Sequence, residues 1–184
     1  FPGRFLIEGD RNDYDYIYAR EKLATLAGKK LHGKRNHIAR FKDSGDWSYE
    51  PMTAENVEEC RTMTYTWIHM REEKWNEEMN QEISVLHEAF DHMQELGLVG
   101  GVLRRDGQIV AFSIGERLNS ETFVVHFEKA YPDLQGAYPM INQQFVQHEC
   151  QEYQYVNREE DTGAEGLRKA KKSYYPVMRG VKYM

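Results

Sequence analysis

The spacing of the apolar residues changes along the chain, and this change restricts the folds that the chain can form. Between residues 53 and 96, apolar residues recur at three- and four-residue steps, as expected for amphipathic helices. Between residues 99 and 129 they alternate with polar residues, as expected for strands. Segments of both kinds follow toward the end of the sequence. We therefore expect an α/β fold in which helices cover a mixed sheet.

Turn residues divide this pattern into elements. Asp106 and Gly107 predict a hairpin turn because both residues accept positive φ angles, and Asn119 and Ser120 predict the next turn. The three strands between residues 99 and 129 should therefore form an antiparallel meander. After residue 46, the expected strands are 47–52, 99–103, 108–117, 122–129, 153–157 and 175–183, and the expected helices are 53–71, 81–96, 136–149 and 163–172. Their order, β-α-α-β-β-β-α-β-α-β, resembles that of the GNAT-like (N-acetyltransferase-type) acyltransferase fold.

The first 45 residues are expected to precede this fold as a separate part. Residues 5–8 predict a short strand tail, and residues 14–26 and 30–41 predict two linking helices with apolar residues at helical spacing. The polar loop that follows is the predicted boundary. Residues 1–45 would then be the remnant or connector of a missing first domain, and residues 46–184 would form the GNAT-like domain.

Charged residues are segregated along the chain, although the formal net charge is only −6. Residues 20–42 carry eight Lys and Arg against one acid, residues 54–96 carry eleven acids against three Lys and Arg, and residues 163–184 carry six Lys and Arg against one acid. Such blocks are usually solvated faces, but the two basic blocks could also converge on a phosphate-bearing partner. The sequence leaves open whether they meet.

Membrane and metal sites are not indicated by the sequence. No apolar run approaches the ~20 residues of a membrane span and no secretory signal pattern opens the chain, so we expect a cytoplasmic protein without a transmembrane segment. The seven His residues lack zinc-binding spacing, and no metal is expected. Cys60 and Cys150 lie in predicted helices, and we expect idle thiols rather than a disulfide.

The first candidate for chemistry is the turn that opens the predicted helix 136–149, with Gln135, Gly136, Ala137 and Tyr138. A glycine at a helix start lets backbone N–H groups approach a phosphate, and the helix dipole adds a partial positive charge there. GNAT enzymes hold the pyrophosphate of coenzyme A with a Gly-rich turn of this kind, and this turn, with one glycine, matches it in part. The alternative is a plain strand-to-helix turn.

The second candidate is the predicted strand that carries His126 and Glu128. Regular alternation would place these two side chains on one face, with Val125 and Phe127 on the other. An imidazole and a carboxylate beside a catalytic cleft could deprotonate an attacking amine or hydroxyl. The alternative is a solvent-facing surface on which the two groups merely pair.

The third candidate is the charged stretch that follows the predicted strand 153–157. It contains Asn157, Arg158, Glu159, Glu160 and Asp161, and a helix with Arg168, Lys169 and Lys171 begins just after it. Ligands bind where the strands of α/β sheets end, and these cations could bind phosphates. The alternative is a charged turn followed by a capped, solvent-facing amphipathic helix.

Three stretches of the sequence resemble a known bacterial family. They are GKKLHGKRNH at residues 28–37, HFEKA at residues 126–130 and NREEDTGAEGLRKAKKSYYP at residues 157–176. They are similar to the signature stretches of small cytosolic proteins related to the C-terminal domain of phosphatidylglycerol lysyltransferase. The resemblance covers nearly the whole chain. It implies two tandem GNAT-like domains, as in the aminoacyltransferases that build peptidoglycan cross-bridges, with this chain packing on the first of them.

The resemblance and the three candidates together favour a transferase. It would move an acyl group from acetyl-CoA, or an aminoacyl group from aminoacyl-tRNA, to an amine or hydroxyl, with no permanently bound cofactor. His126 or Glu128 would act as the base, and Tyr174 as the acid on the leaving group. The predicted donor-binding residues are Gln135, Gly136, Ala137, Tyr138, Asn157, Arg168, Lys169 and Lys171. The predicted substrate-binding residues are Lys34, Arg35, Arg158, Glu159, Glu160 and Asp161.

The alternative function is a non-catalytic GNAT-like module that binds a nucleotide, a tRNA or a protein partner. DNA is not expected as a partner in either case. The basic block at residues 20–42 favours a large polyanion because each Lys or Arg on a phosphate adds salt-sensitive affinity, whereas the negative net charge argues against one.

Overall fold

The computed structural model describes residues 8–70 and 77–183 of the chain. The strands are β1 (Asp15–Ala19), β2 (Trp47–Pro51), β3 (Val99–Arg105), β4 (Gln108–Arg117), β5 (Thr122–Ala130), β6 (Tyr155–Asn157) and β7 (Met178–Gly180). The α-helices are α1 (Arg20–Thr25), α2 (His32–Asp43), α3 (Val57–His69), α4 (Glu77–Asp91), α5 (Ala137–Glu149) and α6 (Glu165–Lys172). Two 3-10 helices are η1 (Arg11–Asp13) and η2 (Lys29–Leu31).

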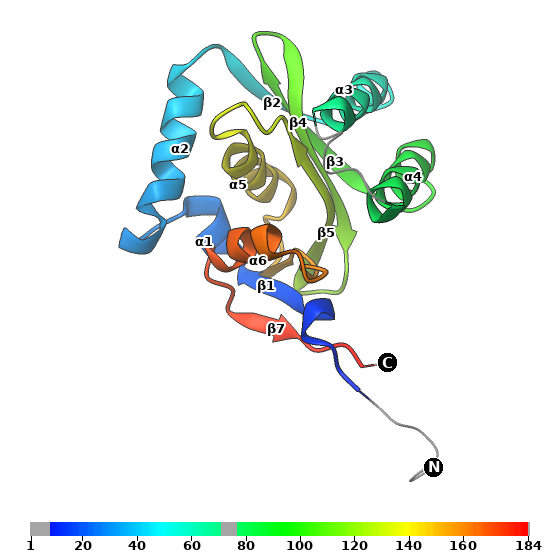
Figure 1. Ribbon diagram of the computed structural model, residues 1–184. Coiled ribbons are helices and arrows are strands. Elements are labelled where there is room, and N and C mark those ends of the chain that lie inside the picture. Colours follow the sequence, from blue (N-terminus) through cyan, green and yellow to red (C-terminus); the bar gives the residue numbers. More distant parts are fainter. Residues whose placement is uncertain (1–7, 71–76, 184) are drawn as a thin grey trace.

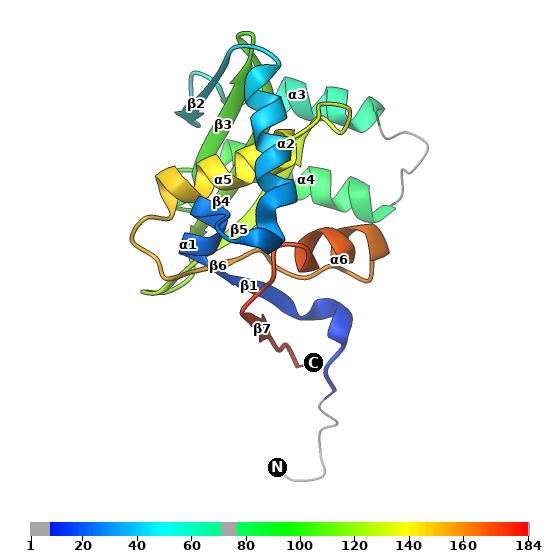
Figure 2. The ribbon, with the colours of Figure 1, turned by 90° about the vertical axis from the view of Figure 1, so that its left-hand side faces the viewer.

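All seven strands belong to one sheet, and helices cover both of its faces (Figure 1). The strand order is β2-β3-β4-β5-β6-β1-β7. On one face α3 and α4 build an apolar core that includes Trp67, Leu86 and Phe112. On the other face α1, α2 and α5 build a second core that includes Tyr18 and Phe41. Figure 2 shows α2 crossing in front of α5, so α5 lies between α2 and the sheet.

Neighbouring strands pair antiparallel, with the exception of β5 and β6. These two strands run parallel and pair over Thr122–Val124 and Tyr155–Asn157. β5 continues to Ala130, whereas β6 ends at Asn157 and the chain leaves the sheet. The two segments therefore diverge beyond Val124 and Asn157, and the candidate site lies where they diverge.

The predicted fold class and element order are confirmed. From residue 47 onward the described chain follows the order β-α-α-β-β-β-α-β-α-β, and β4 matches the predicted strand 108–117 at both ends. The predicted hairpin turn is also present, with φ angles of 50° at Asp106 and 82° at Gly107. The last strand is shorter than the predicted 175–183, since β7 covers Met178–Gly180.

The predicted helix 14–26 is wrong in its first half, because Asp15–Ala19 form β1 and α1 begins only at Arg20. Tyr16 and Tyr18 are fully buried and alternate with half-exposed residues. β6 and β7 pair with β1 on its two sides. Pairing between segments that are distant in the sequence thus overrides the local helical spacing.

The sheet crosses the predicted domain boundary at residue 45. β1 lies between β6 and β7, so residues 15–19 share one sheet with the later strands. The predicted strand tail at residues 5–8 lies outside the described residues, apart from Glu8. That residues 1–45 connect to a further domain stays a prediction.

Candidate active site

A β-bulge interrupts β5 at the candidate site. The pairing of β4 with β5 shifts between Ile114 and Gly115, and His126 is the extra residue on β5. The strands approach closely here, because a Cβ atom on Gly115 would lie only 2.1 Å from the carbonyl oxygen of Val124. Bulges of this kind redirect side chains, and this one redirects the residues that follow it.

The bulge separates the two residues that were predicted to share a face. Val125 packs into the core on the α5 side, whereas Phe127 packs against the core on the α3 and α4 side. Glu128 reaches Asn142 on α5, while His126 reaches β4 and the turn after β6. The predicted common face of His126 and Glu128, opposite Val125 and Phe127, is therefore wrong, because regular alternation stops at the bulge.

Glu128 and Arg158 form an ion pair where β5 and β6 diverge. Arg158 Nη2 donates to Glu128 Oε1 at 2.8 Å, and Asn142 Nδ2 donates to Glu128 Oε2 at 2.9 Å. The two charged side chains are each 12% exposed, and Asn142 is buried. A desolvated ion pair persists only where good geometry and further hydrogen bonds offset the lost hydration. We call these three residues the Glu128 cluster.

Two tyrosine rings and a lysine enclose the Glu128 cluster. The guanidinium carbon of Arg158 lies 5.0 Å from the ring centroid of Tyr174 and 5.7 Å from that of Tyr18. Lys34 Nζ, on α2, lies 4.2 Å from the Tyr174 centroid. Burial and the nearby charge of Arg158 lower the pKa of Lys34. Burial raises the pKa of Tyr174, so this hydroxyl keeps its proton at neutral pH.

Three buried polar atoms beside Glu128 have no hydrogen-bond partner among the described residues. They are Arg158 Nη1, Asn142 Oδ1 and Ser113 Oγ. Ser113 is the cross-strand partner of Glu128 on β4. Each unsatisfied buried polar group costs about 1–3 kcal/mol, and such groups are rare in folded proteins. The site therefore presents a donor, an acceptor and a hydroxyl that a bound molecule could satisfy.

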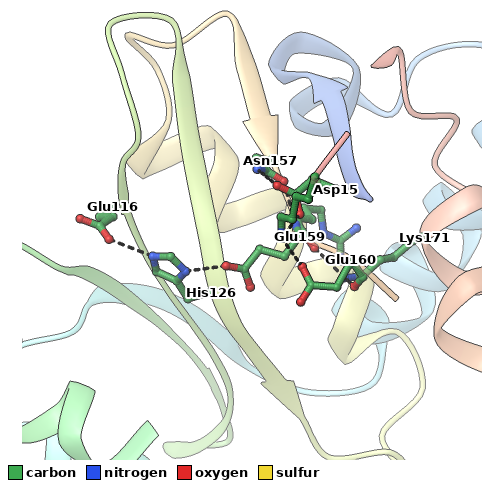
Figure 3. A network of polar contacts seen from close by, with 9 residues as sticks. Asp15, Glu116, His126, Asn157, Glu159, Glu160 and Lys171 are labelled. Atoms are coloured by element: carbon green, nitrogen blue, oxygen red, sulfur yellow. Dashed lines mark hydrogen bonds and ion pairs between the residues drawn. The ribbon is translucent and has the colours of Figure 1, made fainter. Parts of the chain in front are cut away.

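His126 lies between two carboxylates on the other side of the bulge (Figure 3). Nδ1 is 2.8 Å from Glu159 Oε1, and Nε2 is 3.0 Å from Glu116 Oε1. The hydrogen bond to Glu159 raises the pKa of His126 to about 8, with a smaller contribution from Glu116 and against the effect of burial. An imidazolium has no lone pair with which to accept a proton. Glu128 is therefore the better placed of the two predicted bases.

The predicted donor-binding residues Asn157 and Lys171 shape the turn after β6. Asn157 Oδ1 accepts a hydrogen bond from the backbone N–H of Glu159 at 2.8 Å, and its Nδ2 donates to a carboxylate on β1. Lys171 Nζ donates to the backbone carbonyl of Arg158 at 2.6 Å and to that of Glu160. Burial and the charge of Arg158 lower the pKa of Lys171 to about 8. In this structure both residues hold the turn, and their contact with a donor stays a prediction.

Asp161 and Arg168 form a second ion pair behind this turn. Arg168 donates from Nε and Nη2 to the two carboxylate oxygens at 2.9 and 2.8 Å, and the Tyr16 hydroxyl also donates to Asp161. The hydrogen bonds from Arg168 hold the pKa of the buried Asp161 carboxyl well below its usual range. Glu160 pairs with Lys182 at 2.7 Å. These contacts join the turn to β1 and α6, and the predicted substrate contacts of Asp161 and Glu160 stay predictions.

The turn at Gly136 packs directly against α2. Gly136 has a φ angle of 87°, and a Cβ atom there would lie 2.2 Å from the carbonyl oxygen of His37. Ala137 is buried in the core, Gln135 is exposed, and the Tyr138 hydroxyl accepts a hydrogen bond from an indole N–H on α3 at 3.2 Å. Packing of the turn against α2 thus accounts for the glycine. That these four residues hold a donor stays a prediction.

The two basic segments of the sequence meet at Tyr174 and Tyr175. Lys22 Nζ and Lys30 Nζ lie 5.3 and 5.2 Å from the ring centroid of Tyr175, and Lys34 contacts the ring of Tyr174. The segment that follows α6 therefore adjoins α1, η2 and α2. The two segments therefore meet in the structure, and their convergence on a phosphate-bearing partner stays a prediction.

The two other cations with predicted phosphate contacts differ in their surroundings. Arg35 Nη1 donates to the backbone carbonyls of Leu26 and Gly28, and so it closes the end of α1. Lys169 is exposed on α6. The role of both residues in substrate or donor binding stays a prediction.

Sequence reasoning missed Asn142, Ser113 and Tyr18. Asn142 is a buried polar residue among the apolar residues of α5, and Ser113 lies between two buried apolar residues of β4. Both residues could have been found from the sequence, because each is a polar residue within a run of apolar residues that should be buried. Tyr18 lay in the segment predicted as a helix, so its ring could not be placed at the site.

Other features of the described residues are less informative about chemistry. The two described surface cavities, of about 550 and 330 Å³, are lined by residues other than those of the Glu128 cluster. Within residues 8–70 and 77–183, no group of three or more His, Cys, Asp or Glu side chains is placed to hold a metal ion. No helix in those ranges has the length and apolar character that crossing a membrane requires. Cys60 and Cys150 are buried free thiols, as predicted.

Comparison with known proteins links the chain to a family. The family model described as "Phosphatidylglycerol lysyltransferase, C-terminal" matches residues 3–184. A conserved protein of unknown function from Bacteroides thetaiotaomicron is 46% identical with a TM-score of 0.94, over 100% of this chain and 62% of that one. L-PGS from Bacillus licheniformis is 17% identical with a TM-score of 0.64, over 96% of this chain and 60% of that one.

Two further proteins are similar to the chain. The C-terminal domain of a putative lysylphosphatidylglycerol synthetase from Agrobacterium fabrum is 16% identical with a TM-score of 0.66, over 96% of this chain and 60% of that one. An uncharacterised protein of Mycoplasmoides gallisepticum is 24% identical over 166 residues, which are 88% of this chain and 52% of the relative. The chain thus spans about half of this curated relative and about 60% of the solved chains.

Proposed function

Because the chain belongs to the phosphatidylglycerol lysyltransferase C-terminal family, we propose that it transfers an aminoacyl group from a charged tRNA to an amine or hydroxyl acceptor. Family membership and the GNAT-like fold support a transferase. The identity of the donor rests on the Glu128 cluster. The acceptor is proposed only as a nucleophilic nitrogen or oxygen.

The unmatched polar atoms of the Glu128 cluster carry the choice of donor. An α-aminoacyl ester presents an ammonium group and a carbonyl oxygen separated by two carbon atoms. Asn142 Oδ1 is an unpaired acceptor for the ammonium group, and Arg158 Nη1 is an unpaired donor for the carbonyl oxygen. An acetyl group has no amine, so it would leave Asn142 Oδ1 unsatisfied at a cost of about 1–3 kcal/mol. The complementarity favours aminoacyl-tRNA over acetyl-CoA.

The same atoms can support the transfer step. The acceptor nitrogen or oxygen forms a bond to the ester carbonyl carbon and gives its proton to Glu128. Arg158 Nη1 stabilises the negative charge that develops on the carbonyl oxygen, which is a large effect in a site that excludes water. The bond from carbon to the ribose oxygen then breaks, and Tyr174, which stays protonated at neutral pH, gives its proton to that oxygen.

The surface beside the cluster suits a polyanionic donor. Lys22, Lys30 and Lys34 gather around the rings of Tyr174 and Tyr175, and the Tyr174 ring lies 5.0 Å from the guanidinium carbon of Arg158. Phosphates of the tRNA would lie on this surface while the aminoacyl end enters between β5 and β6. Charged tRNA is a cytoplasmic molecule, so the proposal also places the reaction in the cytoplasm. We further propose that another domain of a longer chain packs beside this one and completes the acceptor side.

A donor-consumption assay tests the proposal. Charged tRNA and acetyl-CoA, each labelled on the transferred group, are offered separately with bacterial extract as the source of acceptor. We expect the protein to consume charged tRNA and not acetyl-CoA, and Glu128→Gln to reduce the rate by about 100-fold or more, as loss of a general base does. Consumption of acetyl-CoA alone would assign the other donor. Binding of charged tRNA without consumption would identify the non-catalytic module instead.

A further inference from the structure

Two side-chain bridges cross the space where β5 and β6 diverge. The inner bridge joins Glu128 to Arg158 at 2.8 Å, and the outer bridge joins His126 to Glu159 at 2.8 Å. Arg158 and Glu159 are adjacent in the turn, so the two bridges connect neighbouring residues of one segment to alternate residues of β5. Whatever fixes one of them also restricts the other. The backbone pairing of β5 with β6 has already ended at Asn157.

The outer bridge is charged because of its hydrogen-bond geometry. Glu159 and Glu116 each place a carboxylate oxygen within hydrogen-bond distance of a different ring nitrogen of His126. An ionised carboxylate can only accept a hydrogen bond, so both ring nitrogens must donate. Only the imidazolium form has two N–H groups. His126 is thus a cation that belongs to neither the backbone ladder nor the Glu128 cluster.

The turn after β6 contains an unfavourable backbone conformation that the outer bridge can stabilise. Glu159 has a φ angle of 55°, in the left-handed region that residues other than glycine rarely adopt. Its backbone N–H bonds Asn157 Oδ1, and its carbonyl accepts from the backbone N–H of Tyr16 at 3.0 Å. A strained residue persists where its surroundings over-determine its conformation, and the side chain of Glu159 is anchored by His126.

We infer that the His126 imidazolium is a positioning group for the transfer reaction: by binding Glu159 it fixes the turn after β6 and so holds Arg158 over Glu128. The inference rests on the proposed function. In it His126 acts on Arg158 through Glu159 and does not touch the substrate. It assigns His126 a different role from that of a base. It also accounts for the bulge, which turns His126 away from the Glu128 cluster and toward Glu159.

This positioning should depend on pH. The charged groups that face the imidazole are Glu159 from the turn after β6 and Glu116 from β4, and the hydrogen bond to Glu159 is the main cause of the raised pKa. As the pH rises through about 8, the ring loses one proton and can donate to only one carboxylate. The turn should then loosen, and Arg158 with it. Lys182 pairs with Glu160, and Lys171 donates to the backbone carbonyls of Arg158 and Glu160, so neither lysine replaces the contact with the Glu159 side chain. Burial also lowers the pKa of Lys171 to about 8, so the His126→Gln variant is needed to distinguish the two groups.

The test follows the turn directly rather than activity alone. NMR titration of the His126 ring in the full chain should give a midpoint near pH 8. Amide hydrogen exchange at Arg158 and Glu159, corrected for its intrinsic pH dependence, should accelerate by about 10-fold or more across the same midpoint. In His126→Gln the two amides should exchange rapidly at every pH. In the donor-consumption assay this variant should lose the decline in kcat above pH 8 that the wild-type protein shows.

Two carboxamide variants separate the outer bridge from general effects on the histidine. Glu116→Gln removes the carboxylate on β4. The pH at which amide exchange of the turn accelerates should then be lower, but the acceleration itself should remain. Glu159→Gln removes the link itself, so the step in exchange should disappear even though His126 still titrates. Both substitutions keep the size of the side chain.

Three results would overturn the inference. A His126 midpoint near 6.5 is one, unchanged exchange of the turn in His126→Gln is another, and identical behaviour of the two carboxamide variants is the third. Exchange and ring titration do not require turnover. A protein that passes these tests but consumes no charged tRNA would therefore contradict the proposed function and leave the bridge in place.

Discussion

Replacing Arg158 by methionine should strongly destabilise the protein, because it strands a buried carboxylate. Glu128 and Arg158 are each 12% exposed, and the ion pair between them is 2.8 Å long. In Arg158→Met, Glu128 keeps one donor, Asn142 Nδ2. Breaking a buried ion pair by removing one partner costs about 3–5 kcal/mol of unfolding free energy, since the other charge stays desolvated. We expect a loss in this range.

The double variant Arg158→Met/Glu128→Leu should behave differently. It removes both charges and leaves apolar side chains of similar length in the same space. Replacing a whole buried ion pair in this way is often neutral or stabilising by about 1–4 kcal/mol. The double variant should therefore regain most of the stability that Arg158→Met loses, less the cost of leaving the buried Asn142 Nδ2 without an acceptor, and it should have no transferase activity. Such a result would mean that the pair is retained for function rather than for stability.

Urea unfolding followed by tryptophan fluorescence measures these differences. Arg61→Met is the matched control, because Arg61 is 18% exposed but its partners Asp91 and Glu58 are 57% and 72% exposed. Its loss should be about 0–1 kcal/mol, as for surface ion pairs. The reasoning fails if Arg158→Met costs no more than this control. It also fails if the double variant is destabilised by the sum of the two single substitutions.

Four further predictions concern the surroundings of the site. Gly136→Ala should lower stability by about 1–3 kcal/mol in thermal unfolding, since φ is 87° and the new Cβ would meet the His37 carbonyl at 2.2 Å; an unchanged melting temperature would contradict this packing. Tyr16→Phe should cost about 1–3 kcal/mol because the buried Asp161 loses a donor, and a neutral effect would show that this bond is dispensable. The hydrogen bond to Glu159 raises the pKa of His126 from 6.5 to about 8, so its stabilisation of the folded state, at most about 2 kcal/mol, should be complete below pH 6.5 and lost through pH 8; His126→Gln should flatten this pH dependence of stability in urea unfolding. Affinity for charged tRNA in filter binding should fall steeply from low to moderate salt, and salt-independent binding would remove tRNA as the donor.

The meander and the helices around it could be predicted because local signals and tertiary structure agree there. β4 matches its predicted bounds, and both residues of the Asp106–Gly107 turn have positive φ angles. The segment Asp15–Ala19 could not be predicted in the same way. The strand that contains Tyr16 and Tyr18 exists because β6 and β7, which lie more than a hundred positions later, pair with it. Single-sequence periodicity carries no information on such partners.

Part of the membership of the candidate site could be predicted from the sequence, but its geometry could not. The charged stretch from Asn157 to Asp161 and the strand with Glu128, which were separate candidates in the sequence, lie together in the structure. The sequence treated β5 as regularly alternating, and a bulge of one residue is invisible to that pattern. It therefore paired His126 with Glu128, whereas the structure pairs His126 with Glu159.

The bulge in β5 and the turn after β6 act together to give Glu128 and Glu159 separate cationic partners. A regular β5 would place His126 and Glu128 on the same face, where a cation beside the carboxylate would compete with Arg158 for it. With the bulge, each carboxylate has its own cation: Arg158 binds Glu128 inside the site, and His126 binds Glu159 at its edge. Because Arg158 and Glu159 are consecutive, the outer pair can orient the inner one without occupying the space that a substrate needs. An Arg158 donor that is buried, oriented and still unpaired is costly to maintain, and this cost favours a role in binding a molecule at the site.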